Sequence, residues 1–179
     1  MIAAPKSPSL PGTRPEGSRD EREASSRVRE MFTHIAPRYD FLNRLLSLSI
    51  DRVWRRRAAA HFAGILRRPE ARVLDVCCGT GDLSFALQRL RPGKSRDAGV
   101  RPIIGSDFVE PMLTRAREKA RAANGSLAFA AADALRLPFA DASFDLVTTA
   151  FGFRNLANYE KGLREFARIL KPGGELGIL

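Results

Sequence analysis

The sequence predicts an α/β fold, in which strands alternate with helices to build a mainly parallel sheet. Residues 73–83 (VLDVCCGTGDL) join an apolar run to a glycine turn and then to a helical pattern that starts at Asp82. Strand, glycine turn and helix form the first unit of an open α/β sheet, whose ligands bind at the carboxyl ends of the strands. Four more apolar runs follow, with amphipathic stretches between them.

The composition divides the chain into three parts. Residues 1–26 mix Pro, Ser, Gly and charge with almost nothing to bury, so we expect them to be disordered. Residues 27–68 carry helical patterns and are expected to form a helical cap over the site. Residues 69–179 hold the glycine turn and the apolar runs, and are expected to form the sheet domain.

The cap is predicted to contain at least two helices. In the first, apolar residues at helical spacing share one face: Val28, Met31, Phe32 and Ile35. Pro37 ends this helix, because a proline pushes the residue before it out of the α region. Asp51 is expected to cap a later helix that holds Trp54.

The sheet domain is expected to contain five strands and the helices between them. The first strand precedes the glycine turn. The other predicted strands cover residues 102–106, 127–131, 144–150 and 175–179, and the later helices cover residues 111–123 and 159–170. Pro172, Gly173 and Gly174 are expected to turn the chain into the last strand. The chain then stops on an apolar residue, and we expect C-terminal strands to be missing.

The charge is concentrated in the cap. The whole chain carries a formal charge of +10, and residues 27–68 hold ten arginines against three acids, a net charge of +7. Such a patch attracts nucleic acid or an anionic membrane surface, and a solvated helix face explains it equally well.

Targeting and redox features indicate a cytoplasmic protein. No signal peptide pattern is visible, and no apolar run approaches the roughly 18 residues of a spanning helix. Cys77 and Cys78 are the only cysteines. Adjacent cysteines make poor disulfides, and two sulfurs make an incomplete zinc site, so no metal is expected.

The glycine turn narrows the choice of ligand. In a dinucleotide-binding loop a third glycine would occupy the position of Ser84, so that match fails. The remaining pattern, D-x-x-C-G-x-G, resembles the first motif of S-adenosylmethionine (AdoMet) dependent methyltransferases. An ordinary strand-to-helix turn is the alternative reading.

Four stretches carry a more specific resemblance. They are residues 28–56, the glycine turn, residues 132–155, which end in FGFRN, and residues 163–174. Together they resemble the menaquinone/ubiquinone biosynthesis C-methyltransferases, within the Rossmann-like class I AdoMet-dependent enzymes. Chains of that family continue through further strands, so an inactive truncated fragment is one alternative. At Ala150 some members carry a serine near the cofactor.

The resemblance implies AdoMet as cofactor. Backbone N–H groups around Gly79, Thr80 and Gly81 suit the methionine carboxylate, and Asp107 suits the ribose hydroxyls. Asp75 organises the loop as much as it touches ligand. The full set of expected cofactor contacts is Asp75, Gly79, Thr80, Gly81, Asp107, Phe108, Asp133 and Ala134, the last two at the adenine.

The resemblance also implies C-methylation of a prenylated quinol, most simply demethylmenaquinol, with a ubiquinone-pathway benzoquinol still open. Arg154 is expected to stabilise the phenolate electrostatically, because arginine stays protonated. Asn155 would orient the hydroxyl or a water. Tyr39 and Asp40 would close the site, with Asp40 as a proton acceptor, whereas His34 is expected to be merely exposed.

The partners follow from the same resemblance. The polyprenyl tail is expected under the apolar face of the cap, although core packing explains part of that face. The basic cap is expected to touch an anionic membrane. A methyltransferase that acts on RNA or on another small molecule is the alternative, but no RNA-binding motif is legible, so no nucleic acid is expected.

Overall fold

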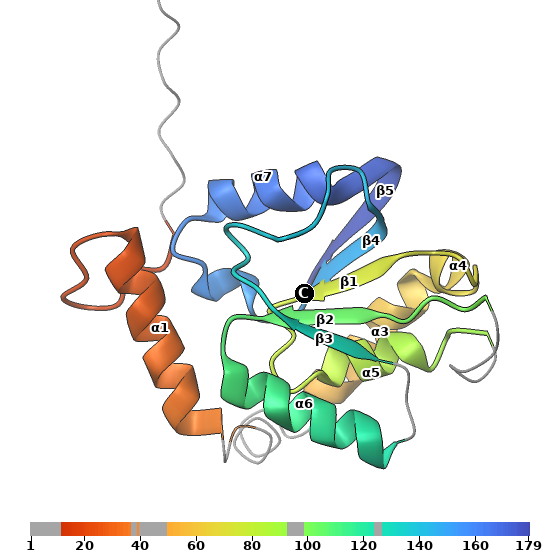
Figure 1. Cartoon of the computed structure of the whole chain (residues 1–179), viewed down its shortest axis with the longest axis horizontal. Helices are drawn as coiled ribbons and strands as arrows, with labels where there is room; N and C mark the ends of the chain where they lie inside the picture. Colours follow the sequence, from red (N-terminus) through yellow and green to blue (C-terminus); the bar gives the residue numbers. More distant parts are fainter. Residues whose placement is uncertain (1–11, 37–38, 40–49, 93–98, 124–126) are drawn as a thin grey trace, which may run out of the picture.

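The computed structural model describes residues 12–36, 39, 50–92, 99–123 and 127–179. Within these ranges it contains a parallel sheet with helices on both sides (Figure 1). The strands are β1 Val73–Val76, β2 Ile104–Asp107, β3 Ala128–Ala131, β4 Phe144–Thr149 and β5 Leu170–Ile178. The helices are α1 Glu21–Ile35, α3 Ile50–His61, α4 Ala63–Leu66, α5 Asp82–Gln88, α6 Glu110–Ala122, α7 Tyr159–Ile169 and the short 3₁₀ helix η2 Phe153–Asn155.

The strand order β3-β2-β1-β4-β5 places the chain's first strand in the middle of the sheet. All of these neighbours run parallel. From β1 the chain builds outward through β2 and β3, then crosses to the other side for β4 and β5. In such doubly wound sheets ligands bind in the crevice outside the carboxyl ends of the strands, where the order reverses. The topology therefore directs attention to the loops after β1 and β4.

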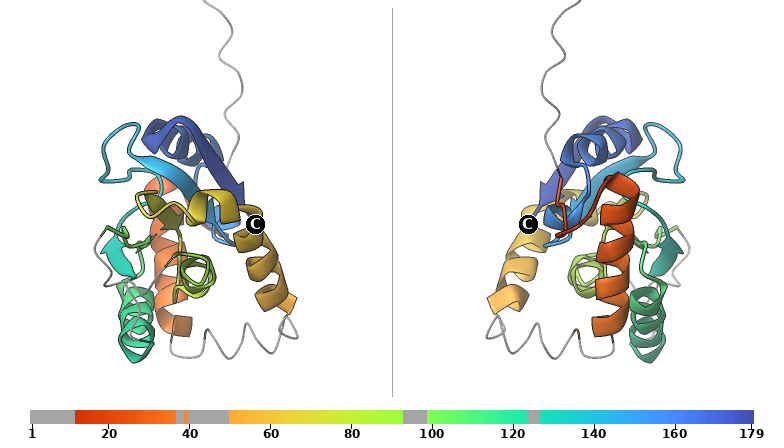
Figure 2. Two further views of the ribbon diagram at one scale, coloured as in Figure 1. Left: turned by 90° about the vertical axis from the view of Figure 1, so that its right-hand side faces the viewer. Right: turned by 90° about the vertical axis from the view of Figure 1, so that its left-hand side faces the viewer.

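Side chains of β1 alternate between two apolar cores. Leu74 and Val76 are buried in one core with Phe166 and Ile169 of α7. Val73 is buried in the other core with residues of α3, α4 and α5. Figure 2 shows α7 on one side of the sheet and α3, α5 and α6 on the other. The predicted α/β class is confirmed, since parallel strands need helices to cover both faces.

The N-terminal segment differs from the prediction. Helix α1 begins at Glu21, and the Asp20 carboxylate caps it by accepting a hydrogen bond from the Glu23 N–H at 2.8 Å. Ala24 is fully buried against Leu156 and Ala157. The prediction of a disordered tail up to residue 26 is therefore wrong for residues 12–26, since the Thr13 N–H also donates to the Leu156 carbonyl at 2.7 Å. Local composition showed little to bury, but the core that these residues join is formed by a distant part of the chain.

Two details of the later elements were also wrong. Asp51 lies inside the first turn of α3, where it pairs with Arg55 instead of capping the helix. The Pro-Gly-Gly segment lies within β5 instead of preceding it. Phe144 pairs with Leu170 and Leu146 pairs with Glu175, so the residues between Leu170 and Glu175 form a bulge. The other predicted strands and helices of the sheet domain are confirmed to within two residues at each end.

Arg91 ties the start of the sheet to its surroundings. Its buried guanidinium donates hydrogen bonds of 2.7–3.3 Å to five backbone carbonyls, those of Leu66, Arg68, Pro69, Ala71 and Arg101. These carbonyls belong to the last residue of α4, to the segment between α4 and β1, and to the approach to β2. One side chain therefore joins three consecutive parts of the chain through hydrogen bonds.

We expect Arg91→Met to lower the free energy of unfolding by about 3 kcal/mol, because several carbonyls lose a charged donor. Chemical denaturation measures this loss. Arg89→Met removes the same charge from an exposed position two residues away and is expected to change stability by less than about 0.5 kcal/mol. Equal losses in the two variants would contradict the role of Arg91.

Candidate cofactor and substrate site

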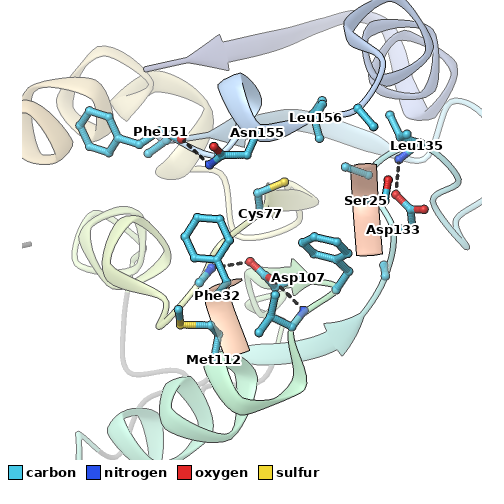
Figure 3. A pocket seen from close by; sticks show the side chains of 18 of the residues that line it. Ser25, Phe32, Cys77, Asp107, Met112, Asp133, Leu135, Phe151, Asn155 and Leu156 are labelled. Atoms are coloured by element: carbon cyan, nitrogen blue, oxygen red, sulfur yellow. Dashed lines mark hydrogen bonds between the residues drawn. The ribbon is translucent and has the colours of Figure 1, made fainter. Parts of the chain in front are cut away.

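An open cavity lies at the carboxyl ends of β1, β2 and β4 (Figure 3). Helix α1 contributes Ser25 and Phe32 to its wall, and Tyr39 follows from the cap. The other lining residues come from the loops after the strands and from α6: Cys77, Gly79, Asp107, Phe108, Val109, Met112, Ala132, Asp133, Ala134, Leu135, Ala150, Phe151, Gly152, Asn155, Leu156 and Ala157. The cavity thus sits between cap and sheet, at the predicted crevice.

The glycine loop has an unusual backbone. Cys77, Gly79 and Gly81 have φ values of 54°, 55° and 85°, in the left-handed region that glycine enters without strain. Gly152 of the FGFRN stretch approaches this loop closely, since a Cβ built on it would lie 2.3 Å from Cys77 Cβ. The loops after β1 and β4 can therefore meet only because residue 152 has no side chain.

Two backbone N–H groups of the loop donate hydrogen bonds within the protein. The Gly79 N–H donates to Asp107 Oδ2 at 2.8 Å, and the Gly81 N–H donates to the Cys78 carbonyl at 2.9 Å. These two N–H groups help to hold the loop in shape, and the expected contact between the loop and a ligand carboxylate stays a prediction. Thr80 is buried, and its hydroxyl accepts a hydrogen bond of 3.0 Å from the Lys119 ammonium group.

Asp107 lies at the end of β2, where it forms part of the wall of the cavity (Figure 3). Its second oxygen, Oδ1, accepts the Val109 N–H at 2.9 Å. Only 7% of the residue is exposed, and burial raises the pKa of this carboxyl. The neighbouring Phe108 is half-buried and lines the same cavity. A carboxylate fixed by two backbone donors keeps lone pairs for the hydroxyls of a ligand.

Asp133 and Ala134 form another part of the wall. The Asp133 carboxylate accepts the Leu135 N–H at 2.9 Å, which fixes the turn after β3. Asp133 is exposed and Ala134 is buried, and both line the cavity. The structure therefore brings these two predicted residues together with Asp107 and Gly79 around one space.

Asp75 is fully buried beneath the glycine loop. It accepts hydrogen bonds from Ser84 Oγ of α5 at 2.6 Å and from Thr148 Oγ1 of β4 at 3.2 Å. Desolvation raises its pKa to about 7, although both hydroxyls oppose the shift. Ser84, the residue that breaks the dinucleotide pattern, thus serves this carboxyl. The geometry supports the view that Asp75 organises the loop.

The predicted catalytic residues are only partly brought together. Asn155 and Tyr39 line the cavity, and the Asn155 side chain donates to the Phe151 carbonyl at 3.4 Å. Arg154 lies on η2 with an exposed side chain and is not among the lining residues. Asp40 lies outside the described residues. His34 is exposed as expected, with Nδ1 2.8 Å from the Glu30 carbonyl oxygen.

Sequence reasoning missed several contributors. Ser25 and Phe32 both line the cavity. Phe32 was predicted only as part of the apolar face of the cap, and Ser25 lay in the segment that was expected to be disordered. Arg55 was counted only in the net charge of the cap, yet it is 7% exposed and paired with Asp51. The i, i+4 spacing of Asp51 and Arg55 was the available signal. The cysteines Cys77 and Cys78 are free, and burial raises the pKa of both thiols.

The fold is that of class I AdoMet-dependent methyltransferases. A protein solved in complex with the Haloferax volcanii Trm112 methyltransferase activator superposes with a TM-score of 0.60 and 32% identity, covering 83% of this chain and 58% of that one. A SAM-dependent methyltransferase from Aquifex aeolicus shares the fold with a TM-score of 0.53 and 23% identity, over 68% of this chain and 62% of that one.

The sequence model of the ubiE/COQ5 methyltransferase family matches residues 19–179, and the chain belongs to that family. It is 52% identical to a demethylmenaquinone methyltransferase of Deinococcus radiodurans, over 89% of this chain and 62% of the relative. It is 44% identical to a ubiquinone/menaquinone biosynthesis C-methyltransferase of Geobacter sulfurreducens, over 88% of this chain and 59% of the relative. The chain thus spans about three-fifths of the length of these relatives. The predicted family is confirmed.

We expect Asp75 to make stability depend on pH. Its pKa of about 7 in the folded chain exceeds the usual 3.8, so the folded state holds a proton that the unfolded chain releases. This contribution to stability is complete below pH ~4, falls as the pH rises to ~7, and then stays low, by roughly 3–4 kcal/mol in all. Thermal unfolding from pH 4.5 to 8 measures it.

Asp75→Asn is the matched control, because it keeps the shape and removes the titration. Its stability relative to the unaltered chain is expected to improve steadily as the pH rises over that range. A constant difference between the two proteins would show that Asp75 does not titrate there.

Proposed function

We propose that this chain transfers the methyl group of AdoMet to a ring carbon of a prenylated quinol, with demethylmenaquinol as the substrate. Family membership supports the reaction class, and relatives at up to 52% identity carry the name demethylmenaquinone methyltransferase. The observation that carries the proposal in the structure is the cavity at the switch point, where cap and sheet residues enclose one space.

The residues around the cavity fit AdoMet. Asp107 would accept hydrogen bonds from the ribose hydroxyls, because its carboxylate is fixed by backbone donors and faces the cavity. Asp133 and the Ala134 backbone would recognise the adenine. Asp75, Gly79, Thr80 and Gly81 would act chiefly by shaping the loop, and Phe108 would contact the adenosine. AdoMet supplies an electrophilic methyl group when bound.

The acceptor ring must become electron-rich before it attacks. A free phenol has a pKa near ~10, so the protein must stabilise the phenolate or remove its proton. Asn155 lines the cavity and would orient the hydroxyl, and Tyr39 would close the site from the cap. Arg154 adjoins Asn155 on η2, and we assign it electrostatic stabilisation of a phenolate placed at that end of the cavity. Asp40 remains the proposed proton acceptor.

We further propose that the cap contacts an anionic membrane at its inner, cytoplasmic face, where a prenylated substrate resides. Three apolar residues of α3 are about half exposed, namely Ile50, Val53 and Trp54. They share a helix with the exposed arginines Arg52, Arg56 and Arg57. Apolar residues, tryptophan and arginine on one helix are typical of interfacial binding. In the described part of the chain no helix is long and apolar enough to cross a membrane.

The test of the reaction follows labelled methyl from AdoMet into demethylmenaquinol, into a demethylated benzoquinol and into RNA. We expect label in the naphthoquinol, whereas label in RNA alone would contradict the proposal.

Arg154→Lys keeps the charge but loses the planar fork, so transfer is expected to slow by at least about tenfold with unchanged cofactor affinity. Wild-type turnover in this variant would remove Arg154 from the mechanism.

For the cofactor site we expect Asp107→Ala to weaken binding of S-adenosylhomocysteine by about 10- to 100-fold, since hydrogen bonds to a charged acceptor are lost. Isothermal titration calorimetry measures the affinity. Glu118→Ala removes an exposed acid from α6, outside the cavity, and is expected to bind normally. Unchanged affinity in Asp107→Ala would move the ribose contact elsewhere.

For membrane contact, Trp54 is the only tryptophan of the chain and reports on α3 directly. We expect its emission to shift to the blue with vesicles that contain phosphatidylglycerol, but not with phosphatidylcholine alone, and salt to reverse the shift. Arg56→Gln is expected to weaken binding about fivefold, near ~1 kcal/mol per basic residue. Arg89→Gln, on a different element, is the control. Emission insensitive to lipid charge would refute this contact.

A further inference from the structure

A second, smaller cavity adjoins the first across the glycine loop. Its wall shares Tyr39, Cys77, Gly79 and Ala150 with the larger cavity. The remaining residues of its wall are Arg55, Asp75, Cys78, Thr80, Asp82 and Leu83. Two spaces joined at one loop suit an elongated ligand, with a ring system in the larger space and a polar tail in the smaller one.

The charges around the two cavities are unequal. Among the described residues that line either one, the acidic side chains are Asp75, Asp82, Asp107 and Asp133, and Arg55 is the single arginine or lysine. AdoMet carries two positive groups, its sulfonium and ammonium, and one negative group, its carboxylate. The acids suit the positive groups. The carboxylate would be repelled by them unless a cation receives it.

Two N–H groups of the glycine loop are already engaged within the protein. Those of Gly79 and Gly81 donate to Asp107 and to the Cys78 carbonyl. Helix α5, which follows the loop, has only seven residues, so few peptide dipoles add up at its start. The strongest group left on the wall of the smaller cavity is the guanidinium of Arg55.

Arg55 is held in place from three sides. Its Nη1 donates to Asp51 Oδ2 on its own helix and lies 3.4 Å from Asp82 Oδ2 of α5. Its guanidinium carbon lies 5.6 Å from the centre of the Phe151 ring, which follows β4. Both of these ion pairs use the same nitrogen. A guanidinium has five N–H donors in a planar fork, and such a fork matches a carboxylate with two parallel hydrogen bonds.

We propose that Arg55 receives the α-carboxylate of AdoMet and so makes the cofactor site select ligands that carry a complete amino-acid tail. This inference rests on the cofactor site proposed above. The proposal gives the cap a second role: α3 completes the cofactor site itself, in addition to any contact with substrate or membrane. It also accounts for a buried arginine beside a loop in which the N–H groups of Gly79 and Gly81 are already engaged.

The test compares AdoMet with decarboxylated AdoMet, which lacks only the carboxylate, by calorimetry on the 179-residue chain without quinol. We expect the unaltered chain to prefer AdoMet by about 10- to 100-fold. In Arg55→Met this preference is expected to disappear through a loss of AdoMet affinity, and in Arg55→Lys to survive in part. A purely structural arginine would instead weaken both ligands equally and leave their ratio unchanged.

A control variant keeps the test decisive. Arg67→Met removes the same charge from an exposed residue outside both cavities and is expected to keep the preference. An unchanged ratio in Arg55→Met, or no preference in the unaltered chain, would each overturn the proposal. Because no acceptor is present, a failed quinol assay leaves this result standing.

Discussion

Two buried carboxylates at the ends of adjacent strands hold the glycine loop, and the site depends on them. Asp75 of β1 accepts hydrogen bonds from hydroxyl groups of α5 and β4. Asp107 of β2 accepts hydrogen bonds from N–H groups of the loop and of the turn before α6. Burying carboxyl groups is costly unless they are hydrogen-bonded. Ser84, Thr148 and backbone N–H groups offset this cost by donating hydrogen bonds to the two carboxyl groups. These bonds hold the loop in shape without a ligand.

The cap and the sheet build the site jointly. Helix α1 brings Phe32 to one wall, and its packing against Val109 and Met112 anchors it beside α6. Helix α3 brings Arg55 to the other side of the glycine loop. Between them the FGFRN stretch approaches Cys77 so closely that only glycine fits at residue 152. The cavity therefore lies where three separate parts of the chain converge.

Local patterns predicted most of the sheet domain. Apolar runs and helical spacing located the strands and later helices, because each element buries a face whose period is visible in sequence. The same patterns placed Asp107, Asp133 and Asn155 after strands, where the structure gathers them around one cavity. Patterns were wrong for residues 12–26, which contact Leu156 and Ala157 far along the chain. They were also wrong for Asp51, which pairs with Arg55.

The sequence by itself determined the α/β class, the glycine loop and the family to which the chain belongs, since these depend on periodicity and on short contiguous motifs. Only the tertiary structure decided which groups remain available to a ligand. It engaged the N–H groups of Gly79 and Gly81 inside the loop, left Arg154 exposed, and buried Arg55 beside the site. Contacts between distant segments decide which hydrogen-bond donors and charged groups are already paired, and a local sequence pattern contains no information about such contacts.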